Sequence, residues 1–368
     1  MSSQRSIQVG TNVLVGPGEP CFLVAEIGNN HQGDVSLARE MVHAAAEAKA
    51  QAVKFQKRNT KALLTAKGRM APYNGNAAFG PTYGEHRDAL ELSVEDMAQL
   101  KELAESLELV FFASVWDMVS LKEMAGLQCG LIKVSSADMV SLPLLRAIGK
   151  LHIPVFLSTG MSSLEEIDAA VAELKNFHDQ IVLLHCNSTY PCPEDEIGLP
   201  VIRQLAQRYR LPVGYSGHES GIGPSVASTA FGACVVERHF TMDKTLRGTD
   251  HKASLEPEEF GRMAAMIREV EAAMRVTEKK VFPSEAIAAG KLRKSVIFAR
   301  DLPAGHVLTE KDILAKCPGG GVSPLSWEKI LGCKLLTRVG CEEAFEWGHV
   351  SKPGAKAADK KIDGIAAE

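Results

Sequence analysis

The sequence predicts an α/β protein: a (β/α)8 TIM barrel followed by a small C-terminal domain. Two observations carry this prediction. Eight short apolar runs, rich in β-branched residues, alternate with amphipathic helical stretches over most of the 368-residue chain, and eight strand–helix units are what this barrel requires. Beyond about residue 278 the alternation stops, and short strand and turn patterns begin.

The eight predicted strands lack strict polar alternation, as expected for parallel strands that are buried on both faces. They are Phe22–Ile27, Ala52–Phe55, Leu109–Ala113, Leu131–Val134, Pro154–Leu157, Ile181–His185, Pro212–Tyr215 and Cys234–Glu237.

Helical patterns lie between the strands. Residues 164–174 place their apolar side chains on one face, and Ser163 and Glu166 ahead of them form a capping-box pattern. Pro257 stands near the start of another apolar stripe, which runs to Met274. The alternative fold, a doubly wound open sheet, would usually carry a glycine-rich phosphate fingerprint after its first strand, and the sequence has none.

One connection, of about 35 residues after the second strand, interrupts this alternation and contains Gly75, Gly80 and Pro81. Loops of that length are uncommon and often functional. Because it follows a barrel strand, we expect it to lie over the mouth of the active site.

The domain limits follow from these patterns. We predict a barrel over 1–278, a linker over 279–294, a small domain over 295–352 and a disordered tail over 353–368, where almost no apolar residues occur. Within the small domain, Ser295–Ala299 and Lys334–Val339 are predicted strands, and Thr309 is predicted to cap a short helix.

Composition excludes several classes of protein. Hydrophobic residues make up 45% and charged residues 23% of the chain, which is ordinary for a globular protein. The net charge of −4 offers no basic surplus for nucleic acid or an anionic membrane.

No apolar run is long enough for a signal peptide or a membrane span. The eight cysteines show no zinc or redox spacing, so we expect reduced thiols in a cytoplasmic enzyme.

Polar residues cluster where the predicted strands end, which is where barrels of this class carry their active sites. They are Glu26, Asn30, His31, Lys54, Gln56, Ser114, Lys133, Ser136, Asp138, Ser158, Thr159, His185, Asn187, Ser188, Tyr190, Ser216, His218, Glu219, Glu237, Arg238 and His239.

Two of these residues, Lys54 and Lys133, lie in otherwise apolar strands, where a buried charge is costly unless it is paired or used. Each lysine could pair with a neighbouring glutamate inside the barrel. The alternative is that both converge on an anionic phosphate or carboxylate, and the hydroxyl residues on neighbouring strands favour this second interpretation.

A metal site is the hypothesis for His218 and His239, which end the seventh and eighth strands. A single barrel histidine would more often be a satisfied core residue, but two at equivalent strand ends favour a divalent ion. Only two protein ligands are visible and no cysteine is near either. This indicates an exchangeable, water-rich site for Mn²⁺ or Mg²⁺ rather than a closed zinc site.

Nine segments of the barrel resemble the sialic acid synthase family. They are AEIGNNHQGD (25–34), VKFQK (53–57), TYGEHRDALELS (82–93), IKVSSAD (132–138), LSTGM (157–161), LLHCNSTYPCP (183–193), GYSGHESG (214–221), VERHFT (236–241) and GTDHKASLEP (248–257). Residues 295–352 resemble the family's C-terminal antifreeze-like (SAF, β-clip type) domain. In that family this domain covers the partner's barrel, which implies a domain-swapped homodimer.

The resemblance implies a function and a role for each site residue. A synthase of this kind condenses phosphoenolpyruvate with N-acetylmannosamine, or its 6-phosphate, to give N-acetylneuraminate, or its 9-phosphate, and phosphate. The implied phosphoenolpyruvate site is Lys54, Ser114, Lys133, Ser136, Ser158, Ser188 and Ser216; the sugar site is Gln56, Asp138, Tyr190 and Asp250; the metal ligands are His218 and His239; and Glu26 is an essential acid.

The implied mechanism begins when the metal polarises the aldehyde of the open-chain sugar. The C3 carbon of phosphoenolpyruvate attacks that aldehyde, water adds at C2, and phosphate leaves by C–O cleavage. Glu26 would orient or deprotonate the water.

Departures from the family pattern leave the acceptor open. Cys317 stands where many bacterial members carry arginine, Asp138 where they carry glutamate and Ser188 where they carry asparagine. Asp138 and the TYGEH block look more like the animal-type enzymes, which use a 6-phosphorylated sugar. Five cations of the long connection, Lys61, Lys67, Arg69, His86 and Arg87, are either suited to a second phosphate or merely solvated.

Two other functions stay open. The first is a related synthase that makes a legionaminic, pseudaminic or deaminated sugar acid with a different acceptor pocket. The second is a carbohydrate-binding or ice-binding protein, which only the C-terminal segment suggests. The charged strand ends of the barrel argue against this non-enzyme alternative.

Overall fold

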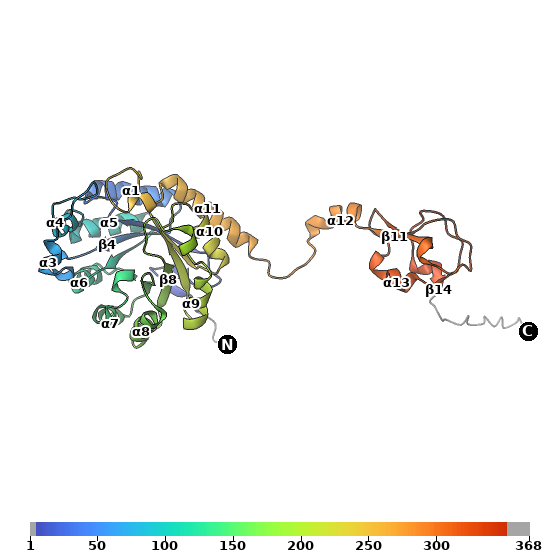
Figure 1. The fold of residues 1–368 in the computed structure, drawn as a ribbon, viewed down its shortest axis with the longest axis horizontal. Coiled ribbons are helices and arrows are strands. Elements are labelled where there is room, and N and C mark those ends of the chain that lie inside the picture. Colours follow the sequence, from blue (N-terminus) through green and yellow to red (C-terminus); the bar gives the residue numbers. More distant parts are fainter. Residues whose placement is uncertain (1–4, 352–368) are drawn as a thin grey trace, which may run out of the picture. The chain divides into compact units, whose positions relative to one another are not determined.

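A computed structural model describes residues 5–351, which form two compact units that divide after Val276 (Figure 1). The first unit is a closed barrel of eight parallel strands in the order β10-β3-β4-β5-β6-β7-β8-β9. The predicted TIM barrel is therefore confirmed. Across residues 5–351, no helix combines the length and apolarity needed to cross a membrane.

The barrel strands match the eight predicted runs to within two residues at either end. They are β3 (Phe22–Gly28), β4 (Ala52–Lys57), β5 (Val110–Val115), β6 (Ile132–Val134), β7 (Val155–Ser158), β8 (Ile181–Cys186), β9 (Val213–Gly217) and β10 (Val235–His239). Several strands extend beyond the predicted C-terminal end. Most of these extra residues, such as Gln56, Ser114 and Ser216, are polar or small, so they break the apolar pattern even though their backbones still pair with the neighbouring strand.

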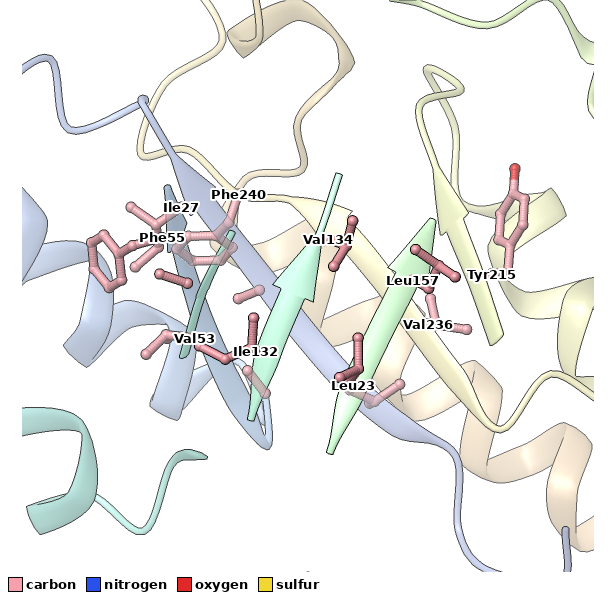
Figure 2. Close-up of a cluster of buried hydrophobic side chains, with 14 of the residues drawn as sticks. Leu23, Ile27, Val53, Phe55, Ile132, Val134, Leu157, Tyr215, Val236 and Phe240 are labelled. Carbon is pink, nitrogen blue, oxygen red and sulfur yellow. The ribbon is translucent and has the colours of Figure 1, made fainter. Parts of the chain in front are cut away.

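Helices surround the barrel, and apolar residues on the outer face of the strands pack against them. The helices are α1 (Val35–Glu47), α5 (Val94–Ser106), α6 (Met118–Gly126), α7 (Leu142–Gly149), α8 (Leu164–Lys175), α9 (Val201–Tyr209), α10 (Gly223–Ala230) and α11 (Pro257–Ala273). Figure 2 shows strand residues of this layer, including Leu23, Val53 and Ile132. The predicted capping box of Ser163 and Glu166 begins α8.

A short hairpin that the sequence did not predict lies at the N-terminal end of the barrel. Strands β1 (Ile7–Val9) and β2 (Val13–Val15) pair antiparallel. Three of their side chains pack with residues at the strand starts, such as Phe22 and Leu131, in the interior apolar cluster. The hairpin thus fills one end of the barrel and leaves the C-terminal strand ends as the place for a polar site.

The long connection after β4 differs from the predicted irregular loop. It contains the helices α2 (Thr60–Leu63), α3 (Ala66–Arg69) and α4 (Tyr83–Asp88). Side chains of Asn59 and Thr65 cap the first two helices, and Thr82 and Glu85 form a capping box on the third. Helices of one or two turns are too short to produce a recognisable hydrophobic period, which explains the error.

The second unit has its own apolar core, which includes Val296, Phe298, Ile330 and Phe345. Its regular elements are β11 (Ser295–Phe298) paired with β12 (Ile313–Lys316), β13 (Lys334–Leu335) paired with β14 (Val350–Ser351), and α13 (Trp327–Ile330). Thr309 begins a 3-10 turn over Glu310–Asp312, at the position predicted for a short helix.

Two predictions for this region need correction. The predicted strand Lys334–Val339 is regular over only two residues. The predicted linker 279–294 contains a helix, α12 (Ala286–Leu292), because its alanine-rich sequence is a good helix former. The predicted tail 353–368 lies outside the described residues.

Candidate active site

Strand register gathers the charged side chains at the C-terminal end of the barrel. Glu26 of β3 lies in register with Lys54 of β4 on one side and with His239 of β10 on the other. On the neighbouring pair, Ser216 of β9 lies in register with Glu237 of β10. These side chains surround a cavity of about 220 Å³.

The cavity is lined by every residue to which the family resemblance gave a role, except Asp138 and Asp250. The residues are Glu26, Lys54, Gln56, Ser114, Lys133, Ser136, Ser158, Ser188, Tyr190, Ser216, His218 and His239, together with Trp116, Ser135, Ala137, Met161, Cys186 and Glu237. Of the other polar strand-end residues, Glu237 lines it, whereas Asn30, His31, Thr159, His185, Asn187, Glu219 and Arg238 do not. Residues from all eight strands, or from the segments that follow them, therefore meet in one polar space.

Two lysines and two glutamates form a buried group of charges in the cavity wall. Lys54 Nζ lies 2.8 Å from Glu26 Oε2 and 3.5 Å from Glu237 Oε1. Lys133 Nζ lies 3.3 Å from the same Glu237 oxygen. The sequence left two interpretations open for these lysines, pairing with a glutamate or binding an anion. The structure is compatible with both, because the lysines pair with glutamates and also line a cavity that could hold an anion.

The two glutamates differ in their acidity. Burial on its own would raise the pKa of Glu237, but Lys133 and Lys54 outweigh it and hold the value at about 2. Burial raises the pKa of Glu26 above its ordinary range, against the opposing effect of Lys54. Glu237 is therefore the fixed counter-charge of the lysines, whereas Glu26 takes up a proton more readily.

Serine hydroxyls surround the lysines. Lys54 Nζ donates to Ser114 Oγ at 3.0 Å, and Ser216 Oγ donates to Glu237 Oε1 at 3.1 Å. The N–H of Gly160 donates to Ser136 Oγ at 3.0 Å. A Cβ at residue 160 would lie 2.4 Å from Ser188 Oγ, so only glycine lets these two hydroxyls approach the backbone.

Several buried polar atoms of the cavity wall have no hydrogen-bond partner among residues 5–351: Ser158 Oγ, Trp116 Nε1, Glu237 Oε2 and His239 Nδ1. Buried polar groups are almost always hydrogen-bonded in folded proteins. The hydroxyl and the indole N–H can both donate to an anion. Their unsatisfied state indicates that the cavity is shaped for a polar ligand.

The two predicted metal ligands meet at this cavity, with ring centroids 5.5 Å apart. His218 Nδ1 lies 2.6 Å from the carbonyl oxygen of Asn187, so this nitrogen carries the proton and leaves Nε2 free to bind a metal. Burial lowers the pKa of His239 to about 4, which keeps this imidazole neutral near pH 7. Two neutral imidazoles fit a divalent ion that takes its other ligands from water or substrate. The expectation that no cysteine is near these histidines was wrong, because Cys186 lines the same cavity with its Sγ 3.9 Å from His218 Nδ1. Even so, the described part of the chain has no group of three or more His, Cys, Asp or Glu residues placed to hold a metal ion.

Asp138 and Asp250 lie beside the cavity rather than in its wall. Ser135 Oγ donates to Asp138 Oδ2 at 2.6 Å, and burial raises the pKa of Asp138 to about 6. Asp250 lines a separate narrow cleft and interacts electrostatically with His239. Asp138 directly follows Ser136 and Ala137, which line the cavity.

Sequence reasoning gave no role to two residues of this region. Glu237 appeared only as a strand-end residue, although it neutralises both lysines. Arg58 follows β4, is buried, and donates to Asn29 Oδ1 and Gln56 Oε1. Its guanidinium lies 5.1 Å from the centre of the Trp116 ring. An arginine directly after a buried strand was the signal that could have found it.

Comparisons with known proteins agree with this geometry. A family model described as the NeuB family matches residues 41–279. An N,N'-diacetyllegionaminic acid synthase of Legionella pneumophila is 36% identical over 91% of this chain and 96% of its own length. A human N-acetylneuraminate-9-phosphate synthase is 37% identical over 93% of this chain and 96% of its own. A solved N-acetylneuraminic acid synthetase of Leptospira borgpetersenii, 31% identical, covers 77% of this chain and 96% of its own with a TM-score of 0.68.

Proposed function

This chain belongs to the NeuB family, and on that premise we propose that it condenses phosphoenolpyruvate with an N-acyl mannosamine-type sugar, releasing phosphate. It is a carbon–carbon bond-forming synthase of the nonulosonic acid class. The observation that carries the proposal is the pair of buried lysines, Lys54 and Lys133, facing a cavity whose wall contains unsatisfied hydrogen-bond donors.

Phosphoenolpyruvate is the ligand that we assign to the lysines. Its carboxylate and phosphate would accept charge-assisted hydrogen bonds from Lys54 and Lys133. The proposed hydroxyl partners are Ser114, Ser136, Ser158, Ser188 and Ser216, all of which line the same cavity. Glu26 lies in the same wall, where its carboxylate pairs with Lys54 Nζ at 2.8 Å.

His218 and His239 are the proposed ligands of Mn²⁺ or Mg²⁺. When bound there, the ion supplies Lewis-acid polarisation of the sugar's carbonyl oxygen. Asn187 orients His218 through its carbonyl group, and Tyr190 stacks on the same imidazole with centroids 4.0 Å apart.

The sugar is assigned to the outer side of the cavity. Gln56 and Tyr190 line the wall there, while Asp250 acts from the adjoining cleft. Asp138 acts through Ser135, whose hydroxyl it binds. We assign to Glu26 the orientation or deprotonation of the attacking water, because it accepts a hydrogen bond of 2.7 Å from Gln56 and also pairs with Lys54.

The second unit is proposed to be an antifreeze-like domain that completes the site of a partner barrel in a cytoplasmic homodimer. A legionaminic or pseudaminic acid synthase is the alternative function, because relatives of both kinds resemble this chain. Synthases of all these sugar acids would bind phosphoenolpyruvate at the two lysines and would differ in the pocket for the acceptor sugar.

Phosphate release tests the proposal directly. The enzyme is incubated with phosphoenolpyruvate, Mn²⁺ and a panel of N-acyl mannosamines, their 6-phosphates and the precursors of legionaminic and pseudaminic acids. We expect phosphate to appear only when both substrates are present, in equal amounts with a new nine-carbon acid detected by mass spectrometry. Absence of product with the whole panel would contradict the proposed function.

A further inference from the structure

A buried ion pair lies directly behind the two histidines of the cavity. Glu219 follows His218 in the chain, and Arg238 precedes His239. Arg238 Nη1 lies 3.0 Å from Glu219 Oε1, and the two side chains are exposed by only 0% and 1%. Neither residue lines the cavity, and none of the roles proposed above for the substrates or the metal uses this pair.

The alternation of side chains along a strand places Arg238 on the outer side of the barrel. Consecutive strand residues point to opposite faces. On β10, Glu237 and His239 line the cavity, so Arg238 between them points outward, toward the surrounding helices. Figure 2 labels Tyr215 and Val236 in this outer layer. Arg238 therefore has no access to a ligand in the cavity, and any effect on the site must pass through the backbone of its neighbours.

Hydrogen bonds from Arg238 join three segments that meet at the site. Nη1 donates to the carbonyl oxygen of Gly221 at 2.8 Å and to Ser225 Oγ, at the start of α10, at 3.0 Å. Nη2 donates to the carbonyl oxygens of Glu219 at 2.5 Å and Ala253 at 3.3 Å. One planar guanidinium thus holds the loop after β9, helix α10 and the segment after β10, a task that its fixed fork of donors suits and a lysine would not.

The carboxylate of Glu219 is held just as firmly. Its Oε1 accepts a hydrogen bond from Ser225 Oγ at 2.6 Å, and its Oε2 accepts one from the Tyr215 hydroxyl at 2.8 Å. The carboxylate also lies against Gly217, where an added Cβ would come within 2.4 Å of Glu219 Oε2 and 2.6 Å of Tyr215 Cε1. His218 therefore stands between two residues, Gly217 and Glu219, that the same network holds in place.

Stability alone does not require this pair. Replacing a buried ion pair by apolar residues of similar volume often leaves a protein equally stable or more so. What Glu219 and Arg238 supply, and apolar side chains cannot, is a set of directional bonds to the backbone beside His218 and His239. The two imidazole centroids lie 5.5 Å apart on separate strands. Ligands from separate strands bind one ion well only when outer partners fix their relative position.

On the premise of the metal site in the proposed function, we propose that Glu219 and Arg238 are positioning residues that hold His218 and His239 at the separation that binds Mn²⁺ or Mg²⁺. They act from the outer layer through the strand backbone and contact neither the ion nor the substrates.

The test measures the dissociation constant of Mn²⁺ on the full chain without substrates, from the EPR signal of free Mn²⁺. Glu219→Gln, which keeps the shape of the side chain, should raise this constant by about tenfold or more, an effect typical of outer partners of metal ligands. Tyr215→Phe removes only the hydroxyl that donates to Glu219 and should raise the constant by about threefold, since one hydrogen bond has a modest net value.

Leu145→Ala is the matched control. Leu145 is buried on α7, which follows β6 on the opposite side of the barrel from β10. Its truncation lowers stability by leaving a cavity, but it should change the Mn²⁺ dissociation constant by less than about twofold.

A double variant separates positioning from stability. Glu219→Leu together with Arg238→Met removes both charges at similar volume, so the free energy of unfolding should recover relative to either single variant. The Mn²⁺ dissociation constant should stay raised by about tenfold or more, because the bonds to the backbone are lost.

The outcomes separate this role from the proposals on which it rests. Unchanged Mn²⁺ affinity of Glu219→Gln, or affinity that recovers together with stability in the double variant, contradicts the positioning role and leaves the metal site standing. If Glu219→Gln does not fold, as judged by circular dichroism, Tyr215→Phe decides the matter, because it retains the ion pair. Unchanged Mn²⁺ binding by His218→Ala contradicts the metal site and this role with it, whereas phosphate release tests the synthase function separately.

Discussion

Lys133 and Glu237 meet across the axis of the barrel, with Nζ 3.3 Å from Oε1. Their strands, β6 and β10, are opposite each other in the closed order. Because Glu237 also lies 3.5 Å from Lys54, one carboxylate serves two lysines. Because the two lysines share this carboxylate, their positive charge is only partly neutralised by it, and both can still bind a further anion.

Lys133→Met should weaken the use of phosphoenolpyruvate. Losing one charge-assisted contact to a buried anion costs about 1.5–3 kcal/mol, so kcat/KM for phosphoenolpyruvate should fall about ten- to a hundredfold or more. Steady-state phosphate release measures this. Lys150→Met, at an exposed lysine after α7, is the control. An unchanged value for Lys133→Met would place that lysine outside the site.

Glu237→Gln should destabilise the barrel. The substitution keeps the shape of the side chain, but it removes the carboxylate that pairs with Lys133 and leaves Lys54 paired with Glu26 alone. Removing one member of a buried ion pair costs about 3–5 kcal/mol, and we expect the free energy of unfolding in urea at pH 7 to fall by that amount. Equal stability of the variant and the wild type would show that the lysines do not depend on Glu237.

Chelation should abolish turnover, and added Mn²⁺ or Mg²⁺ should restore it, if His218 and His239 hold the catalytic ion. His218→Ala should lose activity while its circular dichroism spectrum stays unchanged. His43→Ala, at an exposed position on α1, should behave like the wild type. Full activity of His218→Ala in the presence of chelator would rule out this site.

Removing residues 277–368 tests the proposed assembly. Sedimentation should show a dimer for the full chain. The barrel has its own apolar core, so the shortened chain should fold but lose most of its activity. A fully active monomer of residues 1–276 would contradict the proposed role of the second unit.

Asp312→Asn should destabilise the second unit in a pH-dependent way. Burial would raise the pKa of Asp312, but hydrogen bonds from Thr309, His306 and Arg300 outweigh it and hold the pKa well below its ordinary value. The stabilisation is therefore complete above the ordinary pKa of about 4 and is lost as pH falls below it.

At pH 7 the Asp312→Asn substitution should lower the free energy of unfolding of the second unit by about 1.5–3 kcal/mol, since the hydrogen bonds it weakens are made to an ionised carboxylate. Calorimetry of the full chain at pH 7 and at pH 3 measures the difference between Asp312→Asn and the wild type, which should shrink at the lower pH. Glu310→Gln, at an exposed residue of the same turn, is the control. A difference that is constant between the two pH values would contradict the assigned cause.

The sequence by itself determined the barrel and most of the candidate site. Parallel strands covered on both faces must be apolar, so the eight runs were visible without any structure, and the polar residues that end them were visible for the same reason. The positions of Lys54, Lys133, His218 and His239 at strand ends follow directly from that pattern.

Only the tertiary structure decided which of these residues meet. Lys133 and Glu237 are 104 residues apart, and their contact depends on barrel closure and strand register. Arg87 and Arg247 reach one cleft because an α4 segment and the segment after β10 fold over the same strand ends. The short capped helices after β4 and the hairpin β1–β2 were likewise missed. Hydrophobic periodicity records which face of an element is buried, but it holds no information on which distant side chains share that burial.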